Sequence, residues 1–392
     1  MEIIYTGEEI PEVIKKSLFL AGPSLRPGQE KELTSWREGA INILRDKGYD
    51  GVIFCPENRD MISNENFDYN EQVKWEDKCL NIADCIVFWI PRDLKNLPAF
   101  TTNDEYGYWK GSGKVVLGCP ADAEKTSYQE FYAKEFNIPF SKTLADTMQD
   151  AIDKIGDGAE RSGGERFVPL FVWKTETFQQ WYKSQTNAKN RLDWARVLYS
   201  FRPNNGDFVF MWILKVHVYI SEENRVKTNE FVLSRTNISS VVMWHREKHL
   251  ENSKIILIRE FRSPAVTKDG FVIENVGGSS HNSLNNEKII IQEIKEETGF
   301  DINIEKLKPV GSRQISGTLS AHKSFVFSYE LSREELEYFV SRINESYGNE
   351  NDTEITYIKV FSLSNILSAD IDWATLGQIY SVMYDAGWFN SL

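Results

Sequence analysis

The chain has few cysteines, and its apolar runs are short. The four cysteines, Cys55, Cys79, Cys85 and Cys119, form no C-x-x-C pair, which argues against disulfides and against a structural zinc site. This usage favours a reducing, cytoplasmic location. The longest apolar run, residues 208–216, is too short to cross a bilayer, so we expect no membrane span. No basic region precedes an apolar segment near the amino terminus, so no signal peptide is expected.

Positive charge is also scarce. Lysine and arginine total 45 against 58 aspartates and glutamates, which gives a formal net charge of −13. Such a balance argues against DNA or RNA as a partner. It leaves room for a small phosphorylated ligand, since a few local arginines or a metal ion decide that. With 392 residues the chain is long enough for two domains, each with its own core.

The most informative segment is residues 277–300, GGSSHNSLNNEKIIIQEIKEETGF. Asn285 is a suitable cap for a helix that begins at the next residue. Glu293, Glu296 and Glu297 then stand at positions i, i+3 and i+4, so their carboxylates share one helical face. A hard cation such as Mg²⁺ or Mn²⁺ relieves their mutual repulsion and bridges to a diphosphate. The alternative is a solvated acidic helix face.

This segment resembles the Nudix box, G-x5-E-x7-R-E-U-x-E-E-x-G-U, with U a bulky apolar residue. The resemblance implies an α/β/α Nudix fold with a mixed sheet, and hydrolysis of a nucleoside diphosphate linked to another group. It assigns the metal to Glu293, Glu297 and Glu296, the last also as a catalytic residue. In the ADP-ribose pyrophosphatase branch, the backbone carbonyl before the loop glycine, here that of Gly277, joins them.

Two positions depart from the box. Leu284 stands where the first glutamate is expected, and Gln292 stands where the arginine is expected. In the family those residues brace the loop and orient the helix glutamates. Their replacement keeps the main metal ligands but leaves a second interpretation open, in which the domain binds a nucleotide without cleaving it.

The segments that flank this box narrow the range of expected substrates. Residues 255–264 (IILIREFRSP) and 271–278 (FVIENVGG) resemble the strands before the Nudix box in the ADP-ribose pyrophosphatase branch. Glu274 matches a glutamate of that branch and is a substrate-binding candidate. Arg259 and Arg262 are candidates for contacting phosphate, because guanidinium grips phosphate through two hydrogen bonds. For either arginine alone, a surface position flanking a strand is as good an explanation.

The other end of the chain has a different pattern. Apolar runs end in turn residues and alternate with helical patterns, which predicts a parallel, doubly wound sheet. Ligands of such sheets bind outside the carboxyl ends of the strands. The expected strands cover residues 19–23, 52–57, 83–92 and 114–118, and the expected helices cover 34–47 and begin at 69 and 101.

Residues 15–120 resemble the nucleoside 2-deoxyribosyltransferase family, through FLAGP, FWIPR and TTNDEYG. The glutamate of T-x-x-E-x-G in that family is a nucleophile, and it falls on Glu105; a substrate-gripping aspartate falls on Asp84. The resemblance implies attack of a carboxylate on the anomeric carbon of a nucleoside, with retention. Further candidate pocket residues are Gly22, Gln72, Trp75 and Arg92.

Each of these residues also has a structural interpretation. We expect Glu105 near a helix amino end, which favours its ionised form, yet it is equally a residue type found in the first turn of ordinary helices. Tryptophans such as Trp75 are more often core residues than stacking platforms. Asp84 is suited to capping. Gly22 is expected to let the backbone approach a sugar or phosphate closely.

We expect a first domain over residues 1–155, a Gly-rich linker over 156–164, a helical prelude over 165–204 with a helix spanning 176–199, and a Nudix domain over 205–392. The first interpretation is a bifunctional nucleotide-processing enzyme; NAD would link both halves, because cleavage of its N-glycosidic bond yields ADP-ribose. The second is a nucleotide sensor in which one or both sites only bind. Both resemblances imply a homo-oligomer.

Overall fold

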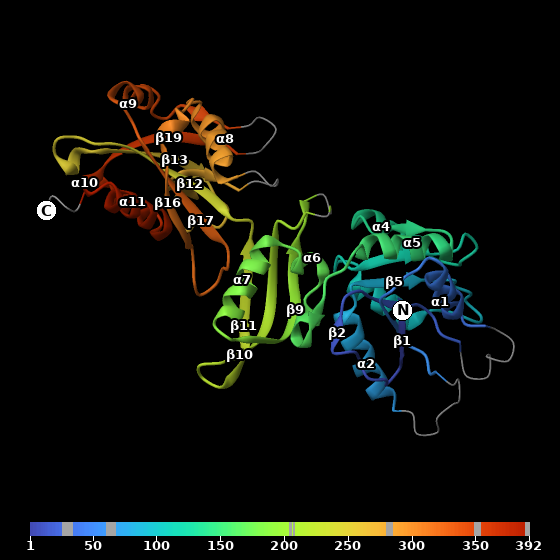
Figure 1. Cartoon of the computed structure of the whole chain (residues 1–392). Helices are drawn as coiled ribbons and strands as arrows, with labels where there is room; N and C mark the ends of the chain where they lie inside the picture. Colours follow the sequence, from blue (N-terminus) through green and yellow to red (C-terminus); the bar gives the residue numbers. More distant parts are fainter. Residues whose placement is uncertain are drawn as a thin grey trace. The chain divides into compact units, whose positions relative to one another are not determined.

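The structure is a computed structural model in which the chain forms two compact units, Met1–Leu233 and Ser234–Leu392 (Figure 1). In the part of the chain that is described, no helix has the length and apolar character needed to cross a membrane. The described residues are 1–25, 34–59, 68–203, 206, 208–279, 285–348 and 354–388.

The first unit contains a six-stranded sheet in the order β1-β4-β3-β5-β6-β7, in which every neighbouring pair is parallel. The expected strands are confirmed, because short apolar runs with both faces covered form central parallel strands. The strands are β1 (Glu2–Tyr5), β3 (Ser17–Ala21), β4 (Val52–Cys55), β5 (Cys85–Trp89), β6 (Val115–Gly118) and β7 (Phe140–Ser141).

Helices cover both faces of this sheet. One face packs against α1 (Trp36–Asp46) and α5 (Leu144–Ile155). The other packs against α2 (Tyr69–Ile82), α3 (Phe100–Trp109) and α4 (Ser127–Glu135). From β3 the chain passes to β4 on one side of the sheet and then to β5 on the other side. The carboxyl ends of β3 and β5 therefore flank the switch point of a doubly wound sheet. The predicted fold class is confirmed here.

Residues 156–164, expected to be a linker, are packed into the first unit. The strand β8 (Arg161–Ser162) pairs antiparallel with β2 (Val13–Ile14) and leads into a 3₁₀ helix over Gly163–Phe167. The glycines serve close packing: a Cβ at Gly158 would lie 2.2 Å from the carbonyl oxygen of Lys15. Their abundance therefore reflects backbone contact and not a flexible tether.

A separate three-stranded sheet, in the order β11-β10-β9, completes the first unit. Helix α7 ends at Asn187, and Lys189 adopts a left-handed conformation with φ of 58°, after which the chain becomes strand. The expected helix over 176–199 is thus wrong beyond residue 187, because residues 191–201 pair with β10. Residues 205–233, assigned above to the Nudix domain, lie in the first unit. The elements are α6 (Leu170–Trp173), α7 (Glu176–Asn187), β9 (Arg191–Phe201), β10 (Met211–Ile220) and β11 (Arg225–Arg235).

The second unit has a mixed sheet in the order β16-β17-β12-β13-β19-β18, with β14 paired to β13 and β15 paired to β12. Strands β12 and β17 run parallel, and β12 and β13 run antiparallel. The strands are β12 (Ile238–His245), β13 (Lys254–Phe261), β14 (Phe271–Glu274), β15 (Val276–Gly278), β16 (Leu307–Gln314), β17 (Lys323–Glu330), β18 (Ser346–Tyr347) and β19 (Thr356–Ser362).

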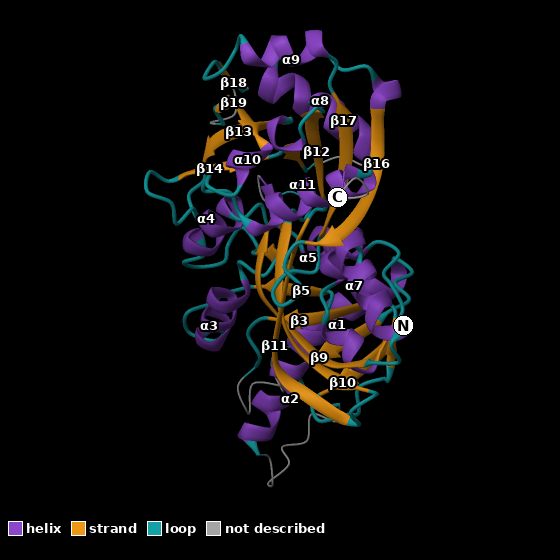
Figure 2. Ribbon diagram, turned by 90° about the vertical axis from the view of Figure 1, so that its left-hand side faces the viewer, coloured by secondary structure: helices purple, strands orange, loops and turns teal. Residues whose placement is uncertain are grey.

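Two helical layers enclose this mixed sheet (Figure 2). Helices α8 (Asn286–Thr298) and α9 (Arg333–Val340) pack on one face. Helices α10 (Leu363–Ile366) and α11 (Trp373–Asp385) pack on the other. The expected α/β/α arrangement with a mixed sheet is confirmed.

Candidate active sites

A cleft of about 300 Å³ opens in the first unit at the carboxyl ends of β3 and β4, beside the switch point. Its lining includes Gly22 after β3, Gln72 from α2 and Glu105 from α3. The structure thus brings together three of the residues predicted from the sequence. Arg37 and Glu76, which the sequence did not single out as site residues, also line the cleft.

Glu105 lies in the second turn of α3, five residues after its first residue, and not at the helix amino end. Burial raises its pKa to about 7, and the nearby Glu76 carboxylate adds to this, against the opposing effect of Arg37. The expectation that a helix terminus favours its ionised form is therefore wrong, because the terminal dipole acts only within the first turn. A carboxyl group poised near neutrality, in a cleft, is typical of a catalytic residue.

Glu76 is the second carboxyl group of the cleft. The Nε2 atom of Gln72 donates a hydrogen bond of 2.6 Å to Glu76 Oε1, one helical turn away on α2. Burial also raises the pKa of Glu76. Two half-buried carboxyl groups near one another titrate as a pair. The i, i+4 spacing of Gln72 and Glu76 was the available sequence signal, but nothing local indicates that α2 faces α3.

Arg37 fixes the wall of the cleft. Its guanidinium is buried and donates to the carbonyl oxygens of Leu20 and Gly22 at 3.0 and 2.7 Å. It also forms an ion pair of 2.8 Å with Glu57. A buried arginine bound to backbone in this way fixes the carboxyl end of β3 at Leu20–Gly22. Its position next to Trp36 at the start of α1 is the only local hint of this role in the sequence.

Gly22 is required by the packing of the chain itself. Its φ is +151°, and a Cβ there would lie 2.3 Å from the carbonyl oxygen of Trp89 and 2.9 Å from the indole of Trp36. The close approach at Gly22 is to β5 and α1, and the expected approach to a sugar or phosphate stays a prediction. The glycine also lines the cleft.

Asp84 is not in the cleft. It lies just before β5, at the amino edge of the sheet, and is buried. Its Oδ1 atom is 2.6 Å from Arg161 Nη2, and its Oδ2 atom accepts hydrogen bonds from the backbone N and the hydroxyl of Ser17. The predicted substrate contact is therefore corrected to a buried ion pair that holds β3, β5 and β8 together.

Trp75 and Arg92 also lie outside the cleft lining. The Trp75 ring packs on the core, and its Nε1 donates to the carbonyl oxygen of Glu8 at 3.1 Å, which is the core role weighed above. Arg92 is buried and donates to the Lys125 carbonyl and to Asn103 Oδ1. Because Asn103 precedes Glu105 by two residues on α3, Arg92 supports the helix and does not face a ligand.

In the second unit, α8 begins and ends as predicted. The side chain of Asn285 accepts from the backbone N of Lys288 at 2.9 Å, and Gly299 ends the helix with φ of 68°. Glu297 is buried and accepts from the backbone N of Gly277 at 3.1 Å. The backbone at Gly278 rests on Glu293, since a Cβ there would lie 2.0 Å from Glu293 Oε1.

Burial is the main cause that raises the pKa values of the two inner glutamates. The pKa of Glu293 rises to about 7, with Glu296 as the next cause, and that of Glu297 rises well above its usual value, with Glu293 as the next cause. Glu296 is exposed and accepts from Gln292 Nε2 at 2.9 Å. Gln292 therefore orients a helix glutamate although it lacks the charge of an arginine. Leu284 lies outside the described residues.

Arg262 is the centre of an ion-pair network. Its Nη2 atom is 2.9 Å from both Glu260 Oε2 and Glu274 Oε1, and its Nη1 atom is 3.6 Å from Glu354 Oε1. The predicted residues Arg262 and Glu274 thus meet, but each is engaged by the other. Glu260, which sequence reasoning missed, is buried and has a pKa raised to about 7 by burial.

Arg259 lies on the opposite side of β13. Neighbouring strand residues point to opposite faces, and Arg259 binds Asp269 at 2.8 Å while its guanidinium carbon lies 3.6 Å from the centroid of the Phe271 ring. The structure therefore does not bring Arg259 into the glutamate cluster, and its expected phosphate contact is replaced by a surface role.

The donor set suits a hard divalent cation, although the side chains do not converge on one point. Over the described ranges, no group of three or more histidine, cysteine, aspartate or glutamate side chains is arranged to hold a metal ion. Glu293, Glu297 and the backbone at Gly277 nonetheless supply the oxygen ligands that Mg²⁺ prefers. The pKa values of Glu293 and Glu297 are raised, which means that their ionised forms are disfavoured when no cation is near. A bound cation would stabilise both carboxylates.

Comparison with known proteins agrees with this geometry in the first unit. Residues 15–123 match the family described as nucleoside 2-deoxyribosyltransferase like. This part of the first unit is thus similar to that family. A solved structure titled "Crystal structure of ADP compounds hydrolase" aligns with 52% of this chain and 95% of its own, at 14% identity and a TM-score of 0.35. No curated protein matches the chain.

Proposed function

We propose that the first unit cleaves or exchanges the N-glycosidic bond of a nucleoside or nucleotide. The observation that carries this proposal is the pair of half-buried carboxyl groups, Glu105 and Glu76, in one cleft beside the switch point of the sheet. Retaining enzymes that act at an anomeric carbon use two such groups, one ionised and one protonated. Repulsion between two neighbouring, half-buried carboxylates favours sharing one proton between them.

In the proposed reaction, a carboxylate oxygen of Glu105 attacks the anomeric carbon as the bond to the base nitrogen breaks. The electron pair of that bond passes to the base, which takes the one proton that the two carboxyl groups share. In the reactive form this proton lies on Glu76 and Glu105 is ionised. Water or a second base then attacks the same carbon, gives its proton to the Glu76 carboxylate, and releases Glu105 as a carboxylate. Gln72 holds Glu76 by its 2.6 Å hydrogen bond, and the positive charge of Arg37 partly offsets the rise in the pKa of both carboxyl groups.

For the second unit we propose hydrolysis of a nucleoside diphosphate derivative such as ADP-ribose. Mg²⁺ or Mn²⁺ held by Glu293 and Glu297, with Glu296 and the Gly277 carbonyl, would supply Lewis-acid chemistry. Glu274 and Glu260 both form ion pairs with Arg262 next to this glutamate cluster. The fusion suggests NAD as a common substrate, because cleavage of its N-glycosidic bond leaves ADP-ribose.

A substrate panel tests both proposals. Purified protein is incubated with deoxynucleosides, nucleosides, nucleotides, NAD and ADP-ribose, with Mg²⁺ or with EDTA, and the products are separated by chromatography. Release of a free base that persists in EDTA supports the first unit's role, and Mg²⁺-dependent AMP formation from ADP-ribose supports the second. Absence of both activities would leave a nucleotide-binding sensor as the better interpretation.

A further inference from the structure

A second, larger cavity of about 920 Å³ lies in the first unit, away from the Glu105 cleft. It is lined by residues just before β6, by the last residues of α3 and α5, and by β9. In a parallel sheet flanked by helices, these elements meet at the amino edge of the strands, and the Glu105 cleft is at the carboxyl edge. Its volume is at the upper end of the range of small-molecule sites.

The net charge of the residues that line this cavity is opposite in sign to the net charge of the whole chain. Two carboxylates, Asp150 and Asp153, face five cationic side chains, although the whole chain has a net charge of −13. The cations are Lys110, Lys114, Lys154, Arg196 and Arg202.

Three of these cations have structural tasks. Lys114 is buried and donates to the carbonyl oxygens of Leu80 and Asn81, at 2.6 and 2.9 Å, which caps the end of α2. Lys110 Nζ lies 3.6 Å from the centroid of an aromatic ring on α4, and the Arg196 guanidinium lies 5.7 Å from that of Tyr108. Their positions follow from packing inside the unit, so they do not by themselves indicate a ligand.

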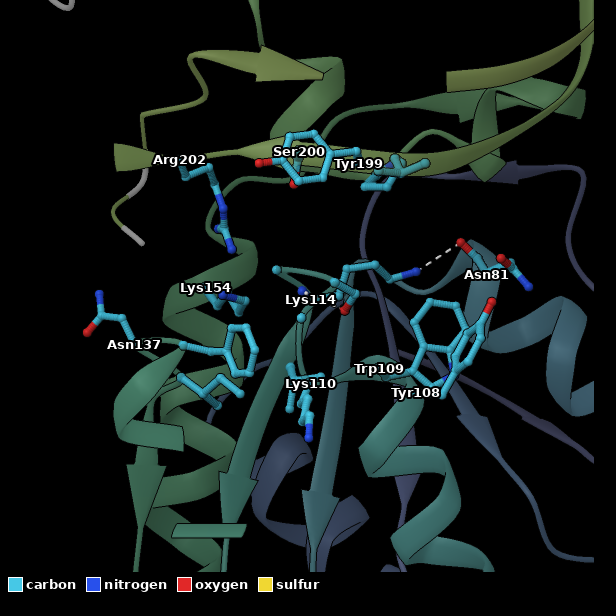
Figure 3. A pocket seen from close by; sticks show the side chains of 18 of the residues that line it. Asn81, Tyr108, Trp109, Lys110, Lys114, Asn137, Lys154, Tyr199, Ser200 and Arg202 are labelled. Carbon is cyan, nitrogen blue, oxygen red and sulfur yellow. Dashed lines mark hydrogen bonds between the residues drawn. The ribbon is translucent and has the colours of Figure 1, made fainter. Parts of the chain in front are cut away.

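The Arg202 guanidinium also contacts an aromatic ring, with its carbon 5.2 Å from the centroid of Phe171, but it shares its side of the cavity with Lys154. Figure 3 shows both on one side of the cavity, with the Arg202 side chain descending from β9 toward Lys154 at the end of α5. The backbone at Gly113, with φ of +79°, makes room for the guanidinium, since a Cβ there would lie 2.6 Å from Arg202 Nη2. Two cations converging on one space, one of them a guanidinium, form a geometry that suits phosphate.

Aromatic side chains occupy the other side. Tyr108 and Trp109 lie across the cavity from Lys154 and Arg202, and Tyr199 lies above on β9 (Figure 3). Tyr108 and Tyr199 are 61% and 49% exposed, so both offer ring surface to a ligand. Stacking on such rings accommodates a planar base without requiring particular hydrogen bonds.

We propose that this cavity binds a nucleotide, with its phosphate at Arg202 and Lys154 and its base against Tyr108 and Tyr199. The site is separate from both proposed reactions and does not depend on either. The same cations would bind inorganic pyrophosphate, whereas the aromatic side would recognise only a ligand that carries a base.

Titration calorimetry on the full chain in EDTA, with AMP, adenosine and pyrophosphate as probes, tests the proposal. Arg202→Ala and Lys154→Ala should each lower the affinity for AMP and for pyrophosphate by about tenfold or more, which corresponds to the loss of one charge-assisted hydrogen bond. Tyr199→Ser should weaken AMP and leave pyrophosphate unchanged. Lys183→Ala, an exposed lysine on α7 outside the cavity, is the matched control and should change neither.

Arg202→Lys keeps the charge and guards against misfolding of the alanine variant; it should retain part of the pyrophosphate affinity. If neither Arg202→Ala nor Tyr199→Ser changes the affinity for AMP, then AMP binds at another site and the proposal is overturned. So would variants that lower the melting temperature while no probe binds the parent protein, because the cations would then serve only to stabilise helix carboxyl ends.

Discussion

Arg161 Nη2 lies 2.6 Å from Asp84 Oδ1, and the two side chains are 1% and 0% exposed. The pair joins a segment expected to be a flexible linker to the start of β5, and Ser17 completes the bonding of the carboxylate. Removing one partner of such a pair leaves the other charge buried and uncompensated. The pair thus acts as a structural joint of the first unit.

Arg161→Met should therefore lower the free energy of unfolding of the first unit by about 3–5 kcal/mol. Urea unfolding followed by tryptophan fluorescence measures this. Asp193→Asn, which breaks the exposed pair of Arg191 and Asp193, is the control and should leave the transition nearly unchanged. Equal effects of the two variants would show that the buried Asp84–Arg161 pair contributes no more to stability than an exposed pair.

Glu105→Gln should abolish base release, reducing it by several orders of magnitude, since an amide is a far poorer nucleophile than a carboxylate. Asp104→Asn should be much milder, because that residue is exposed and rotated about 100° around α3. A 2-fluoro-sugar nucleoside should leave a sugar adduct on the peptide that contains Glu105, detectable by mass spectrometry. An adduct on another peptide would refute the assignment.

The acidic limb of the pH–rate profile should report the Glu105–Glu76 pair. The pKa of Glu105 is raised to about 7, so the ionised nucleophile is lost, and kcat/KM falls, as the pH drops through this value. Glu76→Gln removes a cause that raises this pKa, so the acidic limb should move to lower pH even as the maximal rate decreases. Glu71→Gln, on the exposed part of α2, should leave the limb in place.

Gly22→Ala should destabilise the first unit by about 1–3 kcal/mol, because the new Cβ would meet the Trp89 carbonyl at 2.3 Å in a strained backbone conformation. Gly107→Ala on α3 is the opposite case. Nothing lies within 4 Å of its Cβ position, and alanine favours a helix over glycine by roughly 0.5–1 kcal/mol. Thermal unfolding of both variants should therefore shift in opposite directions.

In the second unit, Glu297→Gln should reduce Mg²⁺-dependent cleavage of ADP-ribose by more than the roughly 100-fold typical of losing an outer-shell partner of a metal. Glu287→Gln, an exposed glutamate in the first turn of the same helix, is the matched control. Circular dichroism verifies that both variants fold. Undiminished activity of Glu297→Gln would remove this residue from the metal site.

Most strands and helices of the first sheet could be predicted from the sequence, because each depends on local apolar runs and turn residues. Helix α8 was predicted to its cap for the same reason, since Asn285 and Gly299 act within one turn. The strand over 191–201 was missed, because its conformation depends on pairing with β10 and not on its own periodicity.

The candidate site was predicted in part, and the misses share a physical cause. Glu105, Gln72 and Gly22 meet in one cleft, as expected from their positions after strands and on helices. Asp84 does not line this cleft, because it pairs with Arg161, 77 residues away in the chain. No local sequence pattern reveals such a long-range ion pair. Arg37 and Glu260 were missed likewise, since their roles come from contacts between separate elements.

The joint at Arg161 also determines where the chain can be divided. A fragment that stopped at residue 155 would contain Asp84 without its counter-charge, and Val13–Ile14 without the strand that pairs with it. The first sheet therefore cannot be treated as an independently excisable module bounded by its last helix. Its smallest self-sufficient version extends past Arg161, and the natural choice for isolating it is the whole of residues 1–233.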